Sequence, residues 1–96
     1  MIEKEKLRSK ILQCRKEIRE LYHQRDQCKT TWKKCLYTVQ EAHREKNPEK
    51  AKTIALKMHR VSKKILNMEN QINTRTMRQR DLQTQMVLLK VKMGEL

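Results

Sequence analysis

The sequence contains no phenylalanine, one glycine and one proline, and aromatic residues make up 3% of its 96 residues. So little bulky apolar material does not predict a compact globular core. Glycine and proline are the residues that most often interrupt helices, so their scarcity leaves long stretches free to be helical. The composition therefore favours long helices joined along a narrow seam.

Long apolar runs are also lacking, because the longest is the four-residue segment 86–89. That length is far too short to cross a bilayer. The charged start of the chain does not predict a signal peptide. Ile2 stands where an N-myristoylation signal requires glycine, so we expect no lipid anchor of that kind.

Acidic residues are scarce, with 11 Asp plus Glu against 24 Lys plus Arg and a net charge of +13. A surface this basic predicts an anionic partner, which could be a membrane, a nucleic acid or an acidic protein segment. The candidate anion-binding residues are Arg8, Arg15, Lys29, Lys50, Lys57, Arg60 and Lys64.

The chain has no glycine-rich phosphate loop, no nucleophile elbow and no carboxylate pair that suggests a shifted pKa. We expect neither an enzyme nor a cofactor, and a straight helical hairpin predicts no concave pocket. Cys14, Cys28 and Cys35 lie fourteen and seven residues apart, whereas zinc-binding cysteines lie two to four apart. We therefore predict no metal site, interpret the cysteines as small seam hydrophobes, and favour a reducing, cytosolic setting.

One turn is predicted at Lys46-Asn47-Pro48-Glu49. Asn is a good N-cap, because its side-chain oxygen accepts a hydrogen bond from the first turn of a helix. Pro is suited to the first helical position, where its missing N–H is not needed. Glu then places negative charge at the positive end of the new helix.

Apolar residues recur before and after this turn with alternating steps of three and four, the pattern of a coiled-coil seam. We predict an all-α antiparallel hairpin, with helices at about 2–45 and 48–95. The seam rows of the first helix are Leu7, Cys14, Leu21, Cys28, Cys35, Ala42 and Lys4, Ile11, Ile18, Arg25, Trp32, Val39. Those of the second helix are Ala51, Met58, Ile65, Ile72, Gln79, Met86, Met93 and Ile54, Val61, Met68, Arg75, Leu82, Leu89, Leu96.

The register follows from pairing seam residues whose numbers sum to 93, which centres the turn between residues 46 and 47. The core pairs are Ala42 with Ala51, Trp32 with Val61, Cys28 with Ile65, Leu21 with Ile72, and Leu7 with Met86. On one flank the predicted charge pairs are Glu45 with Lys50, Glu17 with Arg78, and Glu3 with Lys92. On the other flank Arg8, Arg15 and Lys29 face only Gln83, Thr76 and Ser62. The polar seam residues Arg25, Arg75 and Gln79 either set this register or mark a subunit contact.

The second helix carries segments that resemble the second helix of ESCRT-III proteins, the charged multivesicular body family, and its nucleating subgroup in particular. The segments are Glu-Lys-Ala-Lys at 49–52, Lys57, Glu-Asn-Gln-Ile at 69–72 and Lys-Val-Lys-Met-Gly at 90–94. The first helix, with Gln-Arg-Asp at 24–26, is similar to the family's first helix less specifically.

The resemblance implies a subunit that polymerises with itself and with related subunits on anionic membranes and remodels them. It also implies a cytoplasmic protein, peripheral on endosomal or other membranes. In the family an AAA ATPase binds the acidic C-terminal half, so we expect these residues to be one hairpin that forms the core of a longer protein. The alternative is a basic coiled-coil interaction module that binds nucleic acid or an acidic protein.

Overall fold

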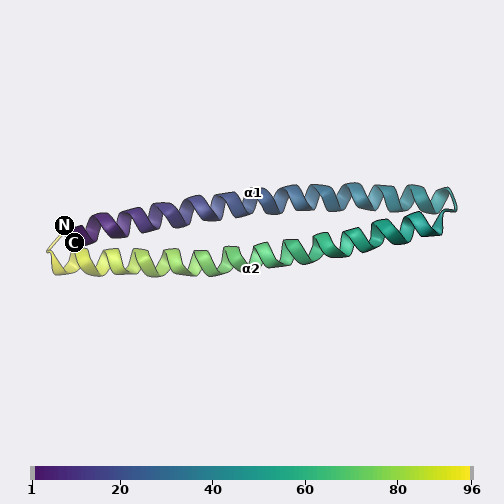
Figure 1. Cartoon of the computed structure of the whole chain (residues 1–96). Coiled ribbons are helices and arrows are strands. Elements are labelled where there is room, and N and C mark those ends of the chain that lie inside the picture. The colour runs from purple at the N-terminus through teal and green to yellow at the C-terminus, as the bar shows by residue number, and fades with distance from the viewer. Residues whose placement is uncertain (1, 96) are drawn as a thin grey trace.

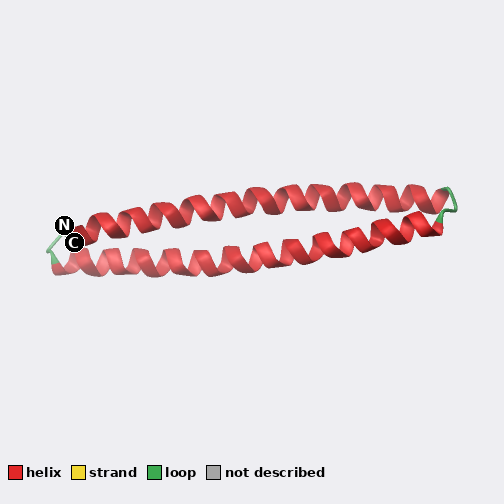
Figure 2. Ribbon diagram, in the orientation of Figure 1, coloured by secondary structure: helices red, strands yellow, loops and turns green. Residues whose placement is uncertain are grey.

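The computed structural model describes residues 2–95. It consists of two helices, α1 (Ile2–Arg44) and α2 (Pro48–Lys92), which pack antiparallel along their whole length (Figure 1). The start of α1 and the residues that follow α2 lie together at one end of a rod of 72 × 18 × 14 Å. Apart from the turn and the residues after α2, the described chain is helical throughout (Figure 2). The predicted all-α hairpin is confirmed.

The turn forms where the sequence predicts it and is closed by backbone hydrogen bonds. The end of α1 is a Schellman motif, in which the amide of Asn47 donates to the carbonyl of Ala42 (2.8 Å) and that of Lys46 donates to His43 (3.1 Å). Asn47 then caps α2, because its side-chain oxygen accepts a hydrogen bond from the amide of Lys50 (3.2 Å). Pro48 occupies the first turn of α2. The predicted capping roles of Asn47 and Pro48 are confirmed.

Lys46 stands at the position of this motif that normally holds glycine, with a φ of 55°. Replacing Lys46 with Gly is expected to raise the free energy of unfolding by about 1 kcal/mol, because Cβ is unfavourable in the left-handed region. Thermal and urea denaturation followed by circular dichroism would measure the gain. Lys46→Ala removes the same charge but keeps Cβ. Equal stability of the two variants would show that charge, not backbone conformation, causes any effect.

The C-terminal end of α2 comes earlier than predicted, at Lys92 rather than near residue 95. Gly94 takes a φ of 70°, and a second Schellman motif forms as its amide donates to Val91 and that of Glu95 donates to Lys90. Met93 therefore lies beyond the helix with 41% of its surface exposed, so its predicted seam position is wrong. The last predicted seam residue, Leu96, lies outside the described residues.

The predicted seam is the core of the hairpin. Among the described residues, every buried side chain lies on one of the four predicted rows: Ile11, Cys14, Cys35, Ala42, Val61, Ile72, Leu82 and Met86. The predicted core residues Ile18, Leu21, Trp32 and Ile65 are only half-buried. Two helices cover each other along one face only, so a seam between them stays open on both flanks. A wide side chain such as that of Trp32 cannot be enclosed there.

Contacts between the helices confirm the register. Ile11, Cys14, Leu82 and Met86 form one buried cluster, against which Leu7 packs as its predicted pairing with Met86 requires. The predicted ion pair between Lys50 and Glu45 forms across the turn (3.8 Å).

Two of the predicted charge pairs differ in detail. The carboxylate of Glu17 binds Arg75 (3.0 Å) instead of Arg78, because the half-buried Arg75 side chain leaves the seam on the flank where Glu17 lies. Glu3 and Lys92 line the same groove, as the register requires, but form no ion pair within residues 2–95.

Candidate anion-binding surface

The charged residues that interrupt the seam have partners inside the hairpin. Arg75 binds Glu17, and Arg25 lies 4.6 Å from the centre of the Tyr22 ring and 3.2 Å from the carboxylate of Asp26. A guanidinium over an aromatic face is a favourable cation–π contact. Lys4 binds Glu95, beyond the end of α2. The contacts of Arg75 and Lys4 join opposite sides of the hairpin and favour a role in setting its register, whereas both partners of Arg25 lie on its own helix.

The pKa of Glu17 is held below its ordinary value of 4.5. The largest cause is the hydrogen bond from the Gln13 amide (3.2 Å), followed by the hydrogen bond from Arg75. The positive charges of Arg75 and Arg78 act in the same direction. The ionised carboxylate therefore favours the folded hairpin.

Replacing Glu17 with Gln is expected to make the stability of the hairpin less sensitive to acid. A depressed folded-state pKa contributes stability above pH 4.5, and this contribution is lost as the pH falls through the folded-state value. Urea denaturation from neutral pH down to about pH 3 would reveal a shallower decline in the variant. The matched control is Glu20→Gln, at an exposed position without an ion pair among residues 2–95. An equal change in slope for both variants would contradict the role of Glu17.

All seven predicted anion-binding residues are exposed. One of them, Lys50, is held by Glu45. The other six have no carboxylate oxygen within 4 Å among the described residues: Arg8, Arg15, Lys29, Lys57, Arg60 and Lys64. These six positive charges are available to an external anion.

The hairpin divides the seven residues between two edges. Arg8, Arg15 and Lys29 share one heptad position on α1, so they lie in a line; we call this line the Arg8 edge. The remaining residues are spaced by seven, three and four residues along the opposite flank of α2, and we call them the Lys57 edge: Lys50, Lys57, Arg60 and Lys64. Either edge can contact an anionic surface. A flat surface cannot contact both edges equally, because they lie on opposite flanks of the hairpin.

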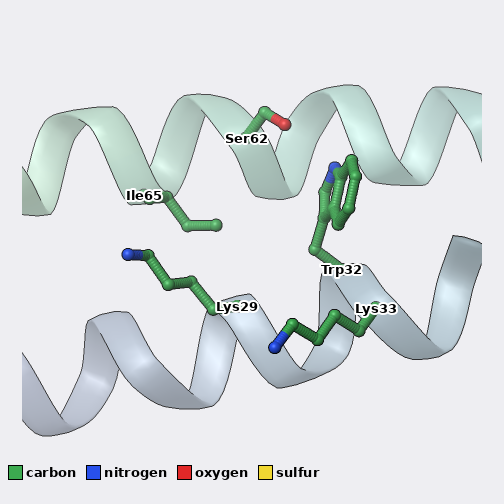
Figure 3. A pocket seen from close by; sticks show the side chains of 5 residues that line it. All are labelled: Lys29, Trp32, Lys33, Ser62 and Ile65. Carbon is green, nitrogen blue, oxygen red and sulfur yellow. The ribbon is translucent and has the colours of Figure 1, made fainter.

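The flanks of the hairpin carry shallow grooves that are open to solvent, and one of about 310 Å³ lies on the flank of the Arg8 edge. Figure 3 shows Trp32 standing between the helices, with Lys29 and Lys33 extending from α1 and Ser62 and Ile65 on α2. The groove exists because Trp32 is only partly covered and the small Ser62 faces it from α2. The seam prediction treated Trp32 as filled core and missed this opening.

A second groove, of about 420 Å³, lies on the same flank and is lined by Leu12, Arg15, Ile18, Arg19 and Gln79. Arg15, Ile18 and Arg19 precede Lys29, Trp32 and Lys33 by fourteen residues each, which is two heptads. The repeat places a pair of basic residues beside each groove.

The outer face of α2 carries apolar residues that sequence reasoning missed. Leu66, Met77 and Leu88 are between 57% and 65% exposed. They recur every eleven residues, which is close to three turns of helix and places them in one line along α2. The signal was present in the sequence as apolar residues outside the seam rows. We call these three residues the outer stripe.

Neither helix in the described part of the chain contains a segment of sufficient length and hydropathy to span a membrane. Comparisons with protein-family models, with curated proteins and with solved structures found no match to this chain. The fold therefore defines the chain as a two-helix antiparallel hairpin, and the likeness to ESCRT-III depends on the sequence segments alone.

Proposed function

We propose that this hairpin is a structural subunit that assembles side by side on anionic membranes and remodels them, in the manner of ESCRT-III proteins. The observation that carries the proposal is the Arg8 edge. Its three cations have no ion-pair partner among residues 2–95 and are exposed along a rod 72 Å long. The corresponding positions of α2 hold Gln83, Thr76 and Ser62, none of which is charged.

Electrostatic adsorption is the first step of the proposed mechanism. Each Lys or Arg near an anionic bilayer contributes about 1 kcal/mol, so a line of such residues binds a membrane without inserting into it. A stiff rod that adsorbs along its length is held parallel to the surface. This geometry suits a peripheral protein on the cytoplasmic face of endosomal or other membranes.

Lateral assembly is the second step, and the outer stripe supports it. Leu66, Met77 and Leu88 lie on the side of α2 away from the seam, where a neighbouring hairpin can cover them. Within the segments that resemble ESCRT-III, Lys50 and Lys57 are exposed and Ile72 is buried in the seam. The segments that resemble ESCRT-III thus supply both exposed positive charge and a buried seam residue. Release by an AAA ATPase would need the acidic region that the family carries beyond its hairpin.

The test is sedimentation with acidic and with neutral liposomes at low and at high salt, with the pellets imaged by electron microscopy. We expect binding to acidic liposomes only, its loss in high salt, and filaments or tubules in the pellet. Absence of both lipid preference and assembly would overturn the proposal and leave the hairpin as an interaction module.

The second candidate function is binding to nucleic acid or to an acidic protein segment. Residues 50–64 favour it, because they contain six Lys or Arg and no Asp or Glu. Adding duplex DNA or RNA to the liposome mixture separates the two functions. Displacement from acidic liposomes at nucleic acid concentrations far below that of the lipid charge would favour this candidate.

A further inference from the structure

We propose that the groove beside Trp32 binds one anionic amphiphile, with its alkyl chain against Trp32 and Ile65 and its phosphate or carboxylate head at Lys29 and Lys33. This inference goes beyond the proposed function, since it requires neither a membrane nor assembly. It concerns a single amphiphile molecule rather than a bilayer surface.

The apolar part of the site is formed by the seam itself. Trp32 and Ile65 occupy seam positions on opposite helices, yet both are half-buried and face the groove (Figure 3). Covering this water-exposed apolar surface with an alkyl chain is favourable, because it removes apolar area from water. The groove is open to solvent and measures about 310 Å³, so one chain can lie along its floor but a two-chain lipid cannot.

The polar part is formed by two lysines one helical turn apart. Lys29 and Lys33 both line the groove, and neither has a carboxylate oxygen within 4 Å among residues 2–95. Residues four apart on a helix lie on the same face, so both ammonium groups can reach one anion. The Ser62 hydroxyl, which lines the groove from α2, offers a further hydrogen-bond donor. The site combines an apolar floor with positive charge on one rim.

The second groove lacks part of this combination. It has the pair Arg15 and Arg19, but Gln79 of α2 lines it where Ile65 lines the first. Ile18 also has a smaller apolar side chain than Trp32. An alkyl chain would bury less apolar area in the second groove, so the structure assigns the amphiphile to the groove at Trp32.

Trp32 is the only tryptophan of the chain, so its fluorescence reports directly on this site. The hairpin is titrated with dodecyl phosphate at concentrations below micelle formation. Dodecyl maltoside, dodecyltrimethylammonium and inorganic phosphate are titrated separately. We expect a saturable shift of the emission to shorter wavelength with dodecyl phosphate, because the chain displaces water from the indole ring. Affinity for dodecyl maltoside is expected to be at least about tenfold weaker, and inorganic phosphate should leave the emission unchanged.

Two variants test the charge without touching the seam. Lys29→Gln together with Lys33→Gln is expected to weaken dodecyl phosphate binding about tenfold. The matched control is Lys6→Gln with Lys10→Gln, which removes two exposed lysines with the same spacing on the same helix. It should change the affinity less than twofold. Ser62→Glu places a carboxylate at the groove and should weaken binding at least as much as the lysine pair.

Several results would overturn the proposal. Equal affinity for dodecyl maltoside would reduce the site to a general apolar patch, and equal affinity for inorganic phosphate would reduce it to an anion site. An emission shift with an acidic amphipathic peptide but not with dodecyl phosphate would show that the groove docks protein. Binding to liposomes without binding of dodecyl phosphate would overturn the groove site and leave the proposed function intact. Binding of dodecyl phosphate without binding to liposomes would overturn the proposed function and leave the groove site.

Discussion

Replacing Arg8, Arg15 and Lys29 with Glu is expected to weaken binding to acidic liposomes by about a hundredfold or more. Each of these side chains near the membrane contributes about 1 kcal/mol, and reversal adds repulsion to the lost attraction. The formal net charge falls from +13 to +7, because each reversal removes two units. All three side chains are exposed and outside the seam, so the helical content should not change. Liposome sedimentation and far-UV circular dichroism measure the two quantities.

Position must be separated from total charge. The matched control reverses Lys6, Lys10 and Lys16, which are exposed residues of α1 outside both proposed binding edges and also leave a net charge of +7. We expect it to lose less than tenfold, since it changes only the long-range field. Equal losses in the two triple variants would remove the Arg8 edge from the mechanism. An unaffected Arg8-edge variant would direct attention to the Lys57 edge.

Replacing Ile72 with Ala is expected to lower the free energy of unfolding by about 3 kcal/mol. Ile72 is 3% exposed, in a hairpin where few side chains are buried. The lost methyl and methylene groups leave a gap between two long helices, which are rigid along their length and cannot close around it locally. Urea denaturation followed by circular dichroism measures the loss, and the melting temperature should fall by more than about 10 °C.

Leu66→Ala is the matched control for this prediction, because Leu66 lies on the same helix and loses a side chain of similar size while being 60% exposed. Its effect on the dilute hairpin should stay within about 0.5 kcal/mol. If both variants were destabilised equally, the assigned seam would be wrong. A concentration-dependent loss confined to Leu66→Ala would instead indicate that the outer stripe is covered by another copy.

The groove at Trp32 shows the limit of heptad reasoning. The heptad assigns Trp32 to the seam, and the structure places it there. Periodicity does not describe how much of a large ring two helices can cover, nor that Ser62 opposite is too small to fill the gap. The same limit applies to Arg75. Its seam position is evident from the heptad, but the register pairs Glu17 with Arg78, whereas the structure pairs Glu17 with Arg75. A seam position is a property of spacing, whereas a side-chain contact depends on rotamers.

By itself the sequence determined the all-α class, the turn at Asn47 and Pro48, the four seam rows and the register. These follow from local capping chemistry and from a repeat that only one pairing of the helices satisfies. The tertiary structure alone decided which seam residues are fully buried, where Arg75 finds its charge partner, and where a groove opens. Those features depend on three-dimensional shape, because in a two-helix rod each side chain has neighbours on one side and water on the other.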